Sequence, residues 1–435
     1  MLKRKIYEYI ENWTRTKDKK CLVVQGARQT GKTYIIERFA EKNYEEIVEI
    51  NFKQMPSLMD IFSGDLTVEN MILAMRFRFA DKKIIPGKTL IFLDEIQECQ
   101  EAITSLKFWA IDNRYDVIVS GSLLGIDYKR ATSYPVGYVD YVTMHGLDFE
   151  EFLWAMGITD DMIGSVRDYL HSKKIIPDFI NNQMMRLYRK YIAIGGMPEA
   201  VQKYIDTEDF REVDTVQRNL LTGYQYDIAH YANAEEKIKA EKCYLTLAKQ
   251  LLDKENHKFQ YKEIEHGARA QKYYASIEWL LRADMVNLCR VVTKLKYDLD
   301  DYSRDDFFRA YTTDLSLLVA MKDFSLKQHI VENTVSGNTK GGIYECAVAD
   351  ALYKKGYSLY FYKNESAKKE LDFIIQIDGQ VVPIEVKSGN NRANSMNQIL
   401  KQEKDIEYGY KFIDGNIGVS EEGCITLPLY MASLI

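Results

Sequence analysis

The stretch that decides the fold is Gly26-Ala27-Arg28-Gln29-Thr30-Gly31-Lys32-Thr33, which fits the pattern GxxxxGK[ST] without a mismatch. A short apolar run over 21–24 precedes it, and a helical pattern follows over about 32–42. In this context, glycines let the backbone wrap a phosphate chain, whose charge meets main-chain N–H groups and the start of a helix. We expect Lys32 to reach the β- and γ-phosphates of a bound triphosphate and the Thr33 hydroxyl to ligate Mg²⁺.

A second apolar run, over 90–93, ends in the carboxylates Asp94 and Glu95, about sixty residues after the glycine-rich loop. We expect Asp94 to bind the Mg²⁺ shell, directly or through water, and Glu95 to orient and deprotonate the attacking water. Strand patterns at 46–52, 89–93 and 115–119 have helical stretches between them. Together with the run at 21–24, they predict a parallel α/β sheet.

The next predicted strand closes with Ser120-Gly121-Ser122. A polar side chain at position 120 is placed to sense the γ-phosphate, although a strand-ending Ser-Gly pair is also ordinary turn chemistry. Both interpretations stay open. For an arginine that completes the site, the candidates are Arg28, Arg114 and Arg130.

The last hundred residues carry a second set of chemically active side chains. Asp372 lies in an apolar run, and Glu385 and Lys387 follow thirteen and fifteen residues later. In a strand, positions 385 and 387 face the same side, so both can point toward a site that Asp372 approaches from a neighbouring strand. We expect Asp372 and Glu385 to hold Mg²⁺, with Glu345 as a further ligand and Lys387 positioning water or stabilising charge. The alternative is a hairpin whose carboxylates face solvent.

Composition limits what these sites can act on. The 435 residues carry 58 Lys and Arg against 64 Asp and Glu, a formal net charge of −6. Proteins that coat nucleic acid are usually basic, so we expect any DNA contact to be local. Six scattered cysteines form no CxxC pair, which disfavours zinc or disulfide frameworks and favours a reducing cytoplasm. No apolar run approaches the ~20 residues that span a bilayer, so we expect no membrane contact.

The chain between the two sites is mostly helical. Residues from about 148 to 255 contain long amphipathic stretches with few breakers. Three helical patterns and an apolar strand over about 237–292 are compatible with a winged helix-turn-helix, and a generic helical core fits them equally well. The charged run over 298–306 predicts a solvated loop, and Asp378 and Gly379 predict a hairpin turn between two strands.

Together these motifs resemble the bacterial and archaeal AAA-type ATPases that carry a C-terminal domain of unknown function with a restriction-endonuclease-like fold. The matching stretches cover essentially the whole chain: 26–33, 90–97, 119–122, 149–153 (FEEFL), 195–199 (GGMPE), 340–345 (KGGIYE) and 384–389. The resemblance implies ATP and Mg²⁺ as cofactors and a PD-(D/E)xK site at Asp372, Glu385 and Lys387. Relatives often show Gly-Arg ahead of the FEEF helix, whereas here Tyr138 follows Gly137.

The sequence thus predicts an α/β fold class with five parts. They are an AAA-type P-loop NTPase domain with a parallel sheet over 1–155, a helical AAA-associated segment over 156–235, a winged-helix-like domain over 236–297, a connector over 298–336, and a restriction-endonuclease-like α/β domain over 337–435.

The predicted function is that of a Mg²⁺-dependent ATPase whose nucleotide state controls a nuclease-like domain that engages nucleic acid. Two alternatives stay open. One is a non-nucleolytic, ATP-dependent regulator whose last domain is a binding module. The other is a nucleotide-gated protein-interaction switch that never touches nucleic acid. Protein partners and self-assembly are compatible with all three.

Overall fold

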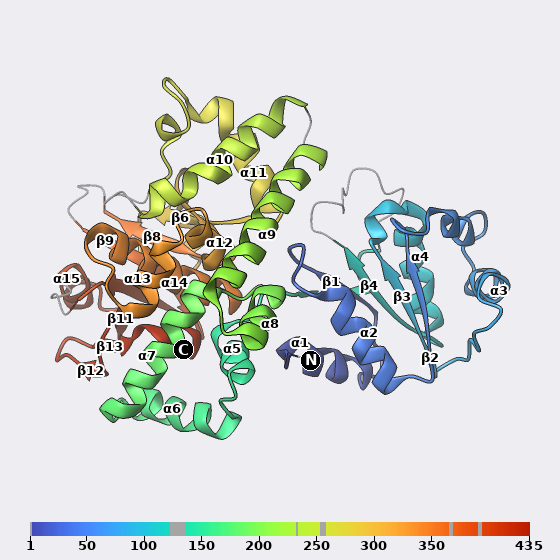
Figure 1. Cartoon of the computed structure of the whole chain (residues 1–435), viewed down its shortest axis with the longest axis horizontal. Helices are drawn as coiled ribbons and strands as arrows, with labels where there is room; N and C mark the ends of the chain where they lie inside the picture. The colour runs from blue at the N-terminus through green and yellow to red at the C-terminus, as the bar shows by residue number, and fades with distance from the viewer. Residues whose placement is uncertain (1, 122–134, 232–233, 253–257, 365–368, 390–393) are drawn as a thin grey trace. The chain divides into compact units, whose positions relative to one another are not determined.

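The computed structural model of the chain describes residues 2–121, 135–231, 234–252, 258–364, 369–389 and 394–435. They divide into two compact units, Lys3–His145 and Gly146–Ile435, each with its own sheet (Figure 1). The predicted first domain runs to 155, but helix α5 (Phe149–Ala155) belongs to the second unit. The ring of Phe149 packs on Tyr188 and Tyr191 of helix α7 (Asp178–Ile194), with centroids 4.9 and 5.5 Å apart.

The first unit alternates strands and helices, with η denoting a 3₁₀ helix. Its elements are α1 (Lys5–Thr14), β1 (Cys21–Gln25), α2 (Lys32–Asn43), β2 (Glu46–Asn51), η1 (Pro56–Phe62), α3 (Val68–Arg78), β3 (Thr89–Asp94), η2 (Ile96–Glu98), α4 (Gln100–Asp112), β4 (Asp116–Gly121) and β5 (Val139–Thr143).

The five-stranded sheet of this unit is parallel throughout, in the order β2-β3-β4-β1-β5. Strand residues alternate between its faces, so Leu22 and Val24 pack with α1 and α2, whereas Val23 packs with α3 and α4. Because both faces are covered, β3 is apolar on both sides and reads as one continuous apolar run. The predicted parallel α/β sheet is confirmed, with β1 to β4 at the predicted positions to within two residues.

The second unit begins with helices and ends with strands. Its elements are α5, α6 (Asp160–Ser172), α7, α8 (Pro198–Thr207), α9 (Phe210–Tyr231), α10 (Ala234–Leu252), η4 (Tyr261–Glu263), α11 (Ala270–Arg282), β6 (Val286–Val292), η5 (Leu299–Tyr302), β7 (Ser303–Thr312), α12 (Leu315–Ala320), α13 (Ser325–Glu332), α14 (Gly337–Lys354), β8 (Tyr360–Lys363), β9 (Glu370–Ile377), β10 (Gln380–Lys387), α15 (Asn394–Gln402), β11 (Gly409–Ile413), β12 (Gly418–Val419), β13 (Cys424–Pro428) and η6 (Leu429–Ser433).

The sheet of the second unit has eight strands in the order β12-β13-β11-β10-β9-β8-β6-β7. It is mixed, because β10, β11 and β13 run parallel while β9 pairs antiparallel with both β8 and β10. The predicted β9–β10 hairpin is confirmed, and Asp378 and Gly379 at its turn have φ of 48° and 81°. Positive φ at both central residues is the geometry of the tight turn that suits two antiparallel strands.

The predicted connector over 298–336 contains regular structure, so that prediction is wrong over much of its length. Strand β7 pairs antiparallel with β6 at one end of the order, and helices α12 and α13 follow. The charged start of β7 is exposed, whereas its residues 308–312 are buried. The charged run includes only the exposed start of β7. The buried remainder of the strand pairs with β6.

The element order around β6 agrees with a winged helix, since helices α10 and α11 precede the β6–β7 hairpin. However, β6 also pairs with β8, with Arg290 opposite Tyr360. The two strands are therefore shared with the eight-stranded sheet, and a winged-helix domain over 236–297 stays a prediction.

A buried ion cluster fixes the centre of the second unit. The side chain of Lys354 on α14 is 1% exposed, and its Nζ lies 3.0 Å from Asp350 Oδ2 and 3.5 Å from Asp314 Oδ2. Asp314 Oδ2 also accepts a hydrogen bond of 2.8 Å from the main-chain N–H of Gly196. A Cβ at Gly195 would approach Ser316 Oγ to 2.0 Å, so the GGMPE stretch needs glycine for close packing.

All six cysteines are buried and unpaired. Burial raises the pKa of Cys99 and of Cys424 to about 11, so neither thiol is a nucleophile at neutral pH. No helix in the described part of the chain is both long and apolar enough to cross a bilayer.

The buried cluster predicts how stability depends on pH. Burial raises the pKa of Asp350 from 3.8 to about 6, so the folded state binds this proton more tightly than the unfolded state does. Protonation of Asp350 therefore stabilises the folded state by at most about 3 kcal/mol. This stabilisation is fully present below pH 3.8 and is lost as the pH rises through about 6. Urea unfolding from pH 4 to 7 should therefore show a smaller loss of stability in Asp350→Asn than in the wild type.

The matched control is Asp168→Asn, which removes an exposed carboxylate from α6 in the same unit. Its pH profile should follow that of the wild type. Parallel profiles for the wild type and Asp350→Asn would show that Asp350 does not titrate in this window.

Candidate functional site

Two glycines shape the loop between β1 and α2. Gly26 has φ of 146°, and a Cβ there would lie 2.2 Å from the carbonyl oxygen of Met144. Gly31 precedes the first turn of α2 with φ of 90°. Both backbone conformations favour glycine. The loop therefore has the close turn and the helix start that a phosphate-binding loop needs.

Polar side chains close this loop from within. Nζ of Lys32 donates to the carbonyl oxygens of Gly26 and Ala27, at 3.0 and 2.8 Å. Thr30 Oγ1 donates to the same Ala27 carbonyl at 3.0 Å. The ammonium group of Lys32 thus lies against the loop that it is predicted to serve.

Arg4 is a loop contact that the sequence did not reveal. Its guanidinium donates to the carbonyl oxygens of Thr30, at 3.2 Å, and of His145, at 2.6 Å. The arginine is buried and lies just before α1. It therefore links the far end of the loop to the segment that follows β5.

The carboxylate of Asp94 is the centre of the site. Its Oδ2 accepts hydrogen bonds from Thr33 Oγ1, at 3.1 Å, and from Asn51 Nδ2, at 2.8 Å. Its Oδ1 accepts from Ser120 Oγ and from the main-chain N–H of Glu95, the latter at 3.0 Å. The structure thus brings together Thr33, Asp94 and Ser120, three of the predicted site residues, and adds Asn51. Asn51 ends β2 directly opposite Asp94. This position follows from the register of the two strands, and no local sequence motif indicates it.

Glu95 sits in a strained position at the end of β3. Its φ is 53°, an uncommon value for a residue with a Cβ. One carboxylate oxygen of Glu95 accepts a hydrogen bond from Gln97 Nε2. A Cβ at Gly121 would lie 2.6 Å from Gln97 Oε1, so the glycine after Ser120 makes room for Gln97. Glu95 is therefore positioned by a second residue that the sequence analysis did not single out.

Two further carboxylates stand close to Asp94. Burial and the charge of Asp94 raise the pKa of Glu37 on α2. Burial and the charges of Glu37 and Asp94 raise the pKa of Glu49 on β2. The negative charge concentrated here favours a cation beside Thr33 and Asp94.

The donor set fits Mg²⁺ bound together with a nucleotide. Mg²⁺ usually takes one or two protein oxygens, with water and substrate phosphates as its other ligands. A hydroxyl and a carboxylate 3.1 Å apart, at Thr33 and Asp94, meet that requirement. A cage of several protein ligands is not needed at such a site.

The arginine candidates are placed differently by the structure. Arg28 and Gln29 are in the loop itself, half-buried and exposed respectively. Arg114 precedes β4 and pairs with Glu69 and Asp112. It therefore lies at the end where the parallel strands begin, whereas the loop lies at the end where they finish. Arg114 therefore cannot serve the site of its own chain. Arg130 and Ser122 lie outside the described residues.

The carboxylates of the second unit surround an arginine. Arg309 on β7 lies with one guanidinium nitrogen 2.6 Å from Glu345 Oε1 and another 2.6 Å from Glu370 Oε1. It also lies 3.9 Å from Asp372 Oδ1 and stacks over the ring of Phe361 at 4.6 Å. The Arg309 side chain is 5% exposed. Sequence patterns do not reveal this arginine, because the charged run over 298–306 predicts a loop and a connector where β7 lies.

The predicted nuclease residues have partners of their own. Asp372 Oδ2 accepts a hydrogen bond of 2.7 Å from the Val386 N–H, and Lys387 Nζ lies 2.7 Å from Glu385 Oε1. Glu345 Oε1 also accepts a hydrogen bond from Tyr311. Burial, together with the charge of Glu345, raises the pKa of Asp372 to about 6.

This arrangement differs from the predicted metal site. Among the residues that the structure describes, no three His, Cys, Asp or Glu side chains are grouped so as to hold a metal ion. Glu385 Oε2 is buried without a hydrogen-bond partner, but a single oxygen is not a ligand set. The physical reason is that Arg309 supplies the positive charge that Glu345 and Glu370 would otherwise lack.

Comparison with protein families agrees with the first site. Residues 18–153 match the family model described as an AAA domain. The match contains the whole loop, β3 and Ser120, and it extends past the first unit into α5. The parallel sheet and the Asp94 contacts are thus those of an AAA-type P-loop fold.

The rest of the chain matches two families whose descriptions give no activity. Residues 185–328 match a domain of unknown function, DUF8612, and residues 340–431 match another, DUF4143. Neither description supports a restriction-endonuclease-like fold, so that assignment stays a prediction. No curated protein is significantly similar to the chain.

Several solved structures show weak likeness to the chain. The Aeropyrum pernix ORC1 protein in complex with DNA is 9% identical, with a TM-score of 0.26 over 76% of this chain and 91% of that one. Drosophila ORC bound to DNA is 13% identical, with a TM-score of 0.28 over 76% of this chain and 95% of that one. C. elegans PCH-2 is 12% identical, with a TM-score of 0.27 over 50% of this chain and 68% of that one. Scores this low carry no argument about fold or function.

The Arg309 contacts predict a large difference between two neighbouring arginines. Replacing Arg309 by Leu leaves the buried Glu345 carboxylate without its counter-charge, which should lower the free energy of unfolding by about 3–5 kcal/mol. The control Arg290→Leu, in the paired strand β6, removes an exposed ion pair of 2.8 Å with Asp305 and should cost less than about 1 kcal/mol. Denaturant unfolding measures both, and equal losses would contradict the structural role of Arg309.

Proposed function

We propose that the AAA domain binds and hydrolyses ATP in a Mg²⁺-dependent reaction. The observation that carries this proposal is the 3.1 Å contact between Thr33 Oγ1 and Asp94 Oδ2, which joins the glycine-rich loop to the carboxylate end of β3. Lys32 and the main-chain N–H groups of the loop hold the phosphates. Bound Mg²⁺ neutralises phosphate charge from its place beside Thr33 and Asp94.

The remaining side chains of the site act on water and on position. Glu95 orients the attacking water and accepts its proton, and Gln97 holds the Glu95 carboxylate. Asn51 and Ser120 hold Asp94 through direct hydrogen bonds. Ser120 remains available to report on the γ-phosphate, because it ends the strand between β1 and β3.

We further propose that the second unit is a non-nucleolytic binding module under nucleotide control. The position of Arg309 supports this choice over cleavage, since its guanidinium already pairs with Glu345 and lies 3.9 Å from Asp372, two of the predicted metal ligands. The net charge of −6 limits any contact with DNA to local patches. The motivation for coupling is that both sites belong to one chain.

Two substitutions separate binding from hydrolysis at the first site. Glu95→Gln should keep Mg²⁺-ATP binding but lower kcat by about 10²-fold or more, because the general base is lost. Lys32→Ala should lose the heat stabilisation that Mg²⁺-ATP gives the wild type. The exposed neighbour Glu98→Gln serves as the control and should behave as the wild type. A folded wild type that shows no thermal or calorimetric response to Mg²⁺-ATP would overturn the proposal.

The second unit can be tested with plasmid and oligonucleotide substrates. With Mg²⁺ or Mn²⁺ present, the wild type, Asp372→Ala and Lys387→Ala should all show the same background level of cleavage. Cutting by the wild type that either substitution abolishes would instead establish a nuclease. A gel-shift series from low to high salt, with and without ATP and with Lys32→Ala as control, then measures DNA retention. No retention at low salt would favour a protein partner.

A further inference from the structure

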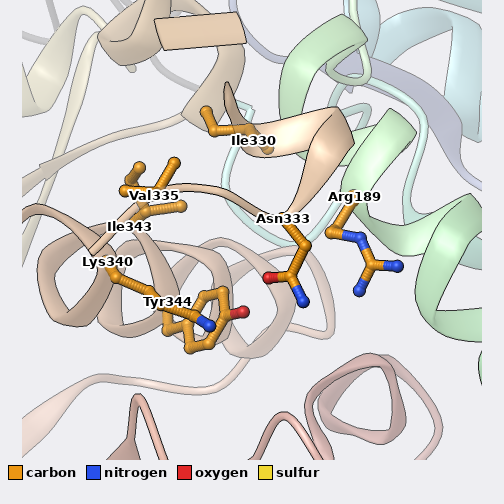
Figure 2. A pocket seen from close by; sticks show the side chains of 7 residues that line it. All are labelled: Arg189, Ile330, Asn333, Val335, Lys340, Ile343 and Tyr344. Atoms are coloured by element: carbon orange, nitrogen blue, oxygen red, sulfur yellow. The ribbon is translucent and has the colours of Figure 1, made fainter. Parts of the chain in front are cut away.

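A small hollow lies in the second unit, between α7, α13 and the first half of α14 (Figure 2). Its walls combine the apolar side chains of Ile330 and Ile343 with the polar groups of Arg189, Asn333, Lys340 and Tyr344. Figure 2 shows the polar ends of Asn333, Lys340 and Tyr344 gathered at one side, with the Arg189 guanidinium next to them. None of these groups belongs to the nucleotide site or to the Arg309 cluster.

One carboxylate, that of Asp414 after β11, lies within 3.9 Å of all four polar groups. Its Oδ2 accepts hydrogen bonds of 3.0 Å from the Tyr344 hydroxyl and 3.3 Å from Asn333 Nδ2, and it lies 3.5 Å from Lys340 Nζ. Arg189 is farther away, with its guanidinium 3.9 Å from Asp414 Oδ1. Two cations thus share one anion, and the contact to Arg189 is too long for a hydrogen bond.

Arg189 has hydrogen-bonding capacity to spare. Its side chain is 13% exposed, and its Nε is buried without a hydrogen-bond partner in the described part of the chain. A guanidinium carries five N–H donors in a planar fork that matches phosphate oxygens. A buried donor that lacks an acceptor is costly, so an anion in the hollow would relieve this arginine.

Lys340 adds a second cation near the start of α14, which begins at Gly337. The positive end of a helix favours anions in its neighbourhood, so the field of α14 acts in the same direction as the two side chains. The side chain of Lys340 is 19% exposed. Both cationic side chains are mostly buried, which favours a small or terminal group over a phosphodiester that continues on both sides.

We propose that this hollow binds a phosphate dianion, either inorganic phosphate or the terminal phosphoryl group of a monoester. Arg189 and Lys340 supply the charge, and Asn333 contributes its amide N–H. Asp414 holds the four donors in place and, as a neighbouring negative charge, limits the affinity.

The test uses the full chain carrying Lys32→Ala, so that phosphate binding at the nucleotide loop is removed from the measurement. Calorimetric titration with sodium phosphate at constant ionic strength should give one site. Arg189→Gln should weaken binding by about tenfold or more, as expected for the loss of a charge-assisted contact. Lys340→Gln should weaken it several-fold. The matched control Arg186→Gln, on an exposed turn of the same helix, should leave binding unchanged.

Asp414→Asn gives a result that a purely structural role would not produce. Loss of the competing charge should tighten phosphate binding several-fold, while thermal unfolding confirms that the variant is folded. Weaker binding by Asp414→Asn, equal binding by Arg189→Gln and Arg186→Gln, or no binding by the parent chain at 10 mM phosphate would each overturn the proposal.

A second set of titrations distinguishes the sources of the phosphate. Adenosine monophosphate, which carries a terminal phosphoryl group, should compete with inorganic phosphate in the Lys32→Ala chain. A short oligonucleotide without terminal phosphates should not compete. Competition by that oligonucleotide, abolished by Arg189→Gln, would replace the proposed ligand with a nucleic-acid backbone.

Discussion

The first unit depends on the hydrogen bonds of one buried carboxylate. Asp94 connects the loop after β1, the end of β2 and the end of β4, because Thr33, Asn51 and Ser120 all donate to it. In a parallel sheet the carboxyl ends of the strands share one edge, and this is where an α/β fold gathers its ligands. The geometry that keeps the sheet in register also prepares the nucleotide site. Structure and chemistry in this unit are thus set by the same few contacts.

A buried cation has the corresponding place in the second unit. Arg309 holds together β7, α14 and β9 through Glu345 and Glu370, and Phe361 covers its face. A buried charge needs partners whose geometry is good, and one partner here, Glu345, is a predicted metal ligand, while Asp372 lies 3.9 Å away. The same carboxylates therefore have a structural role in the folded chain. This is why the presence of Asp372, Glu385 and Lys387 at the right spacing does not by itself imply catalysis.

Buried polar clusters recur through the second unit, and they connect segments far apart in sequence. Lys354 with Asp314 and Asp350 positions the Gly195-Gly196 pair, and Lys327 pairs with Asp214 in a similarly buried setting. Asp414 organises the walls of the hollow beside α14. A polar group that is buried without a hydrogen-bond partner is costly. Among the described residues of these clusters, two atoms, Asp350 Oδ1 and Arg189 Nε, are buried in this way.

The P-loop fold of the first unit can be predicted from sequence alone, because the loop over 26–33 and the acids at 94 and 95 are local patterns tied to local backbone geometry. It also determined the β9–β10 hairpin, whose turn residues favour positive φ. Only the tertiary structure decided the partners of those residues. Asn51 reaches Asp94 through strand register, Arg309 meets Glu345 across 36 positions, and Arg189 meets Asp414 across more than two hundred. Contacts between distant segments leave no periodic trace in a sequence. In this chain such a contact places the charge of Arg309 beside carboxylates whose spacing alone predicts a metal site.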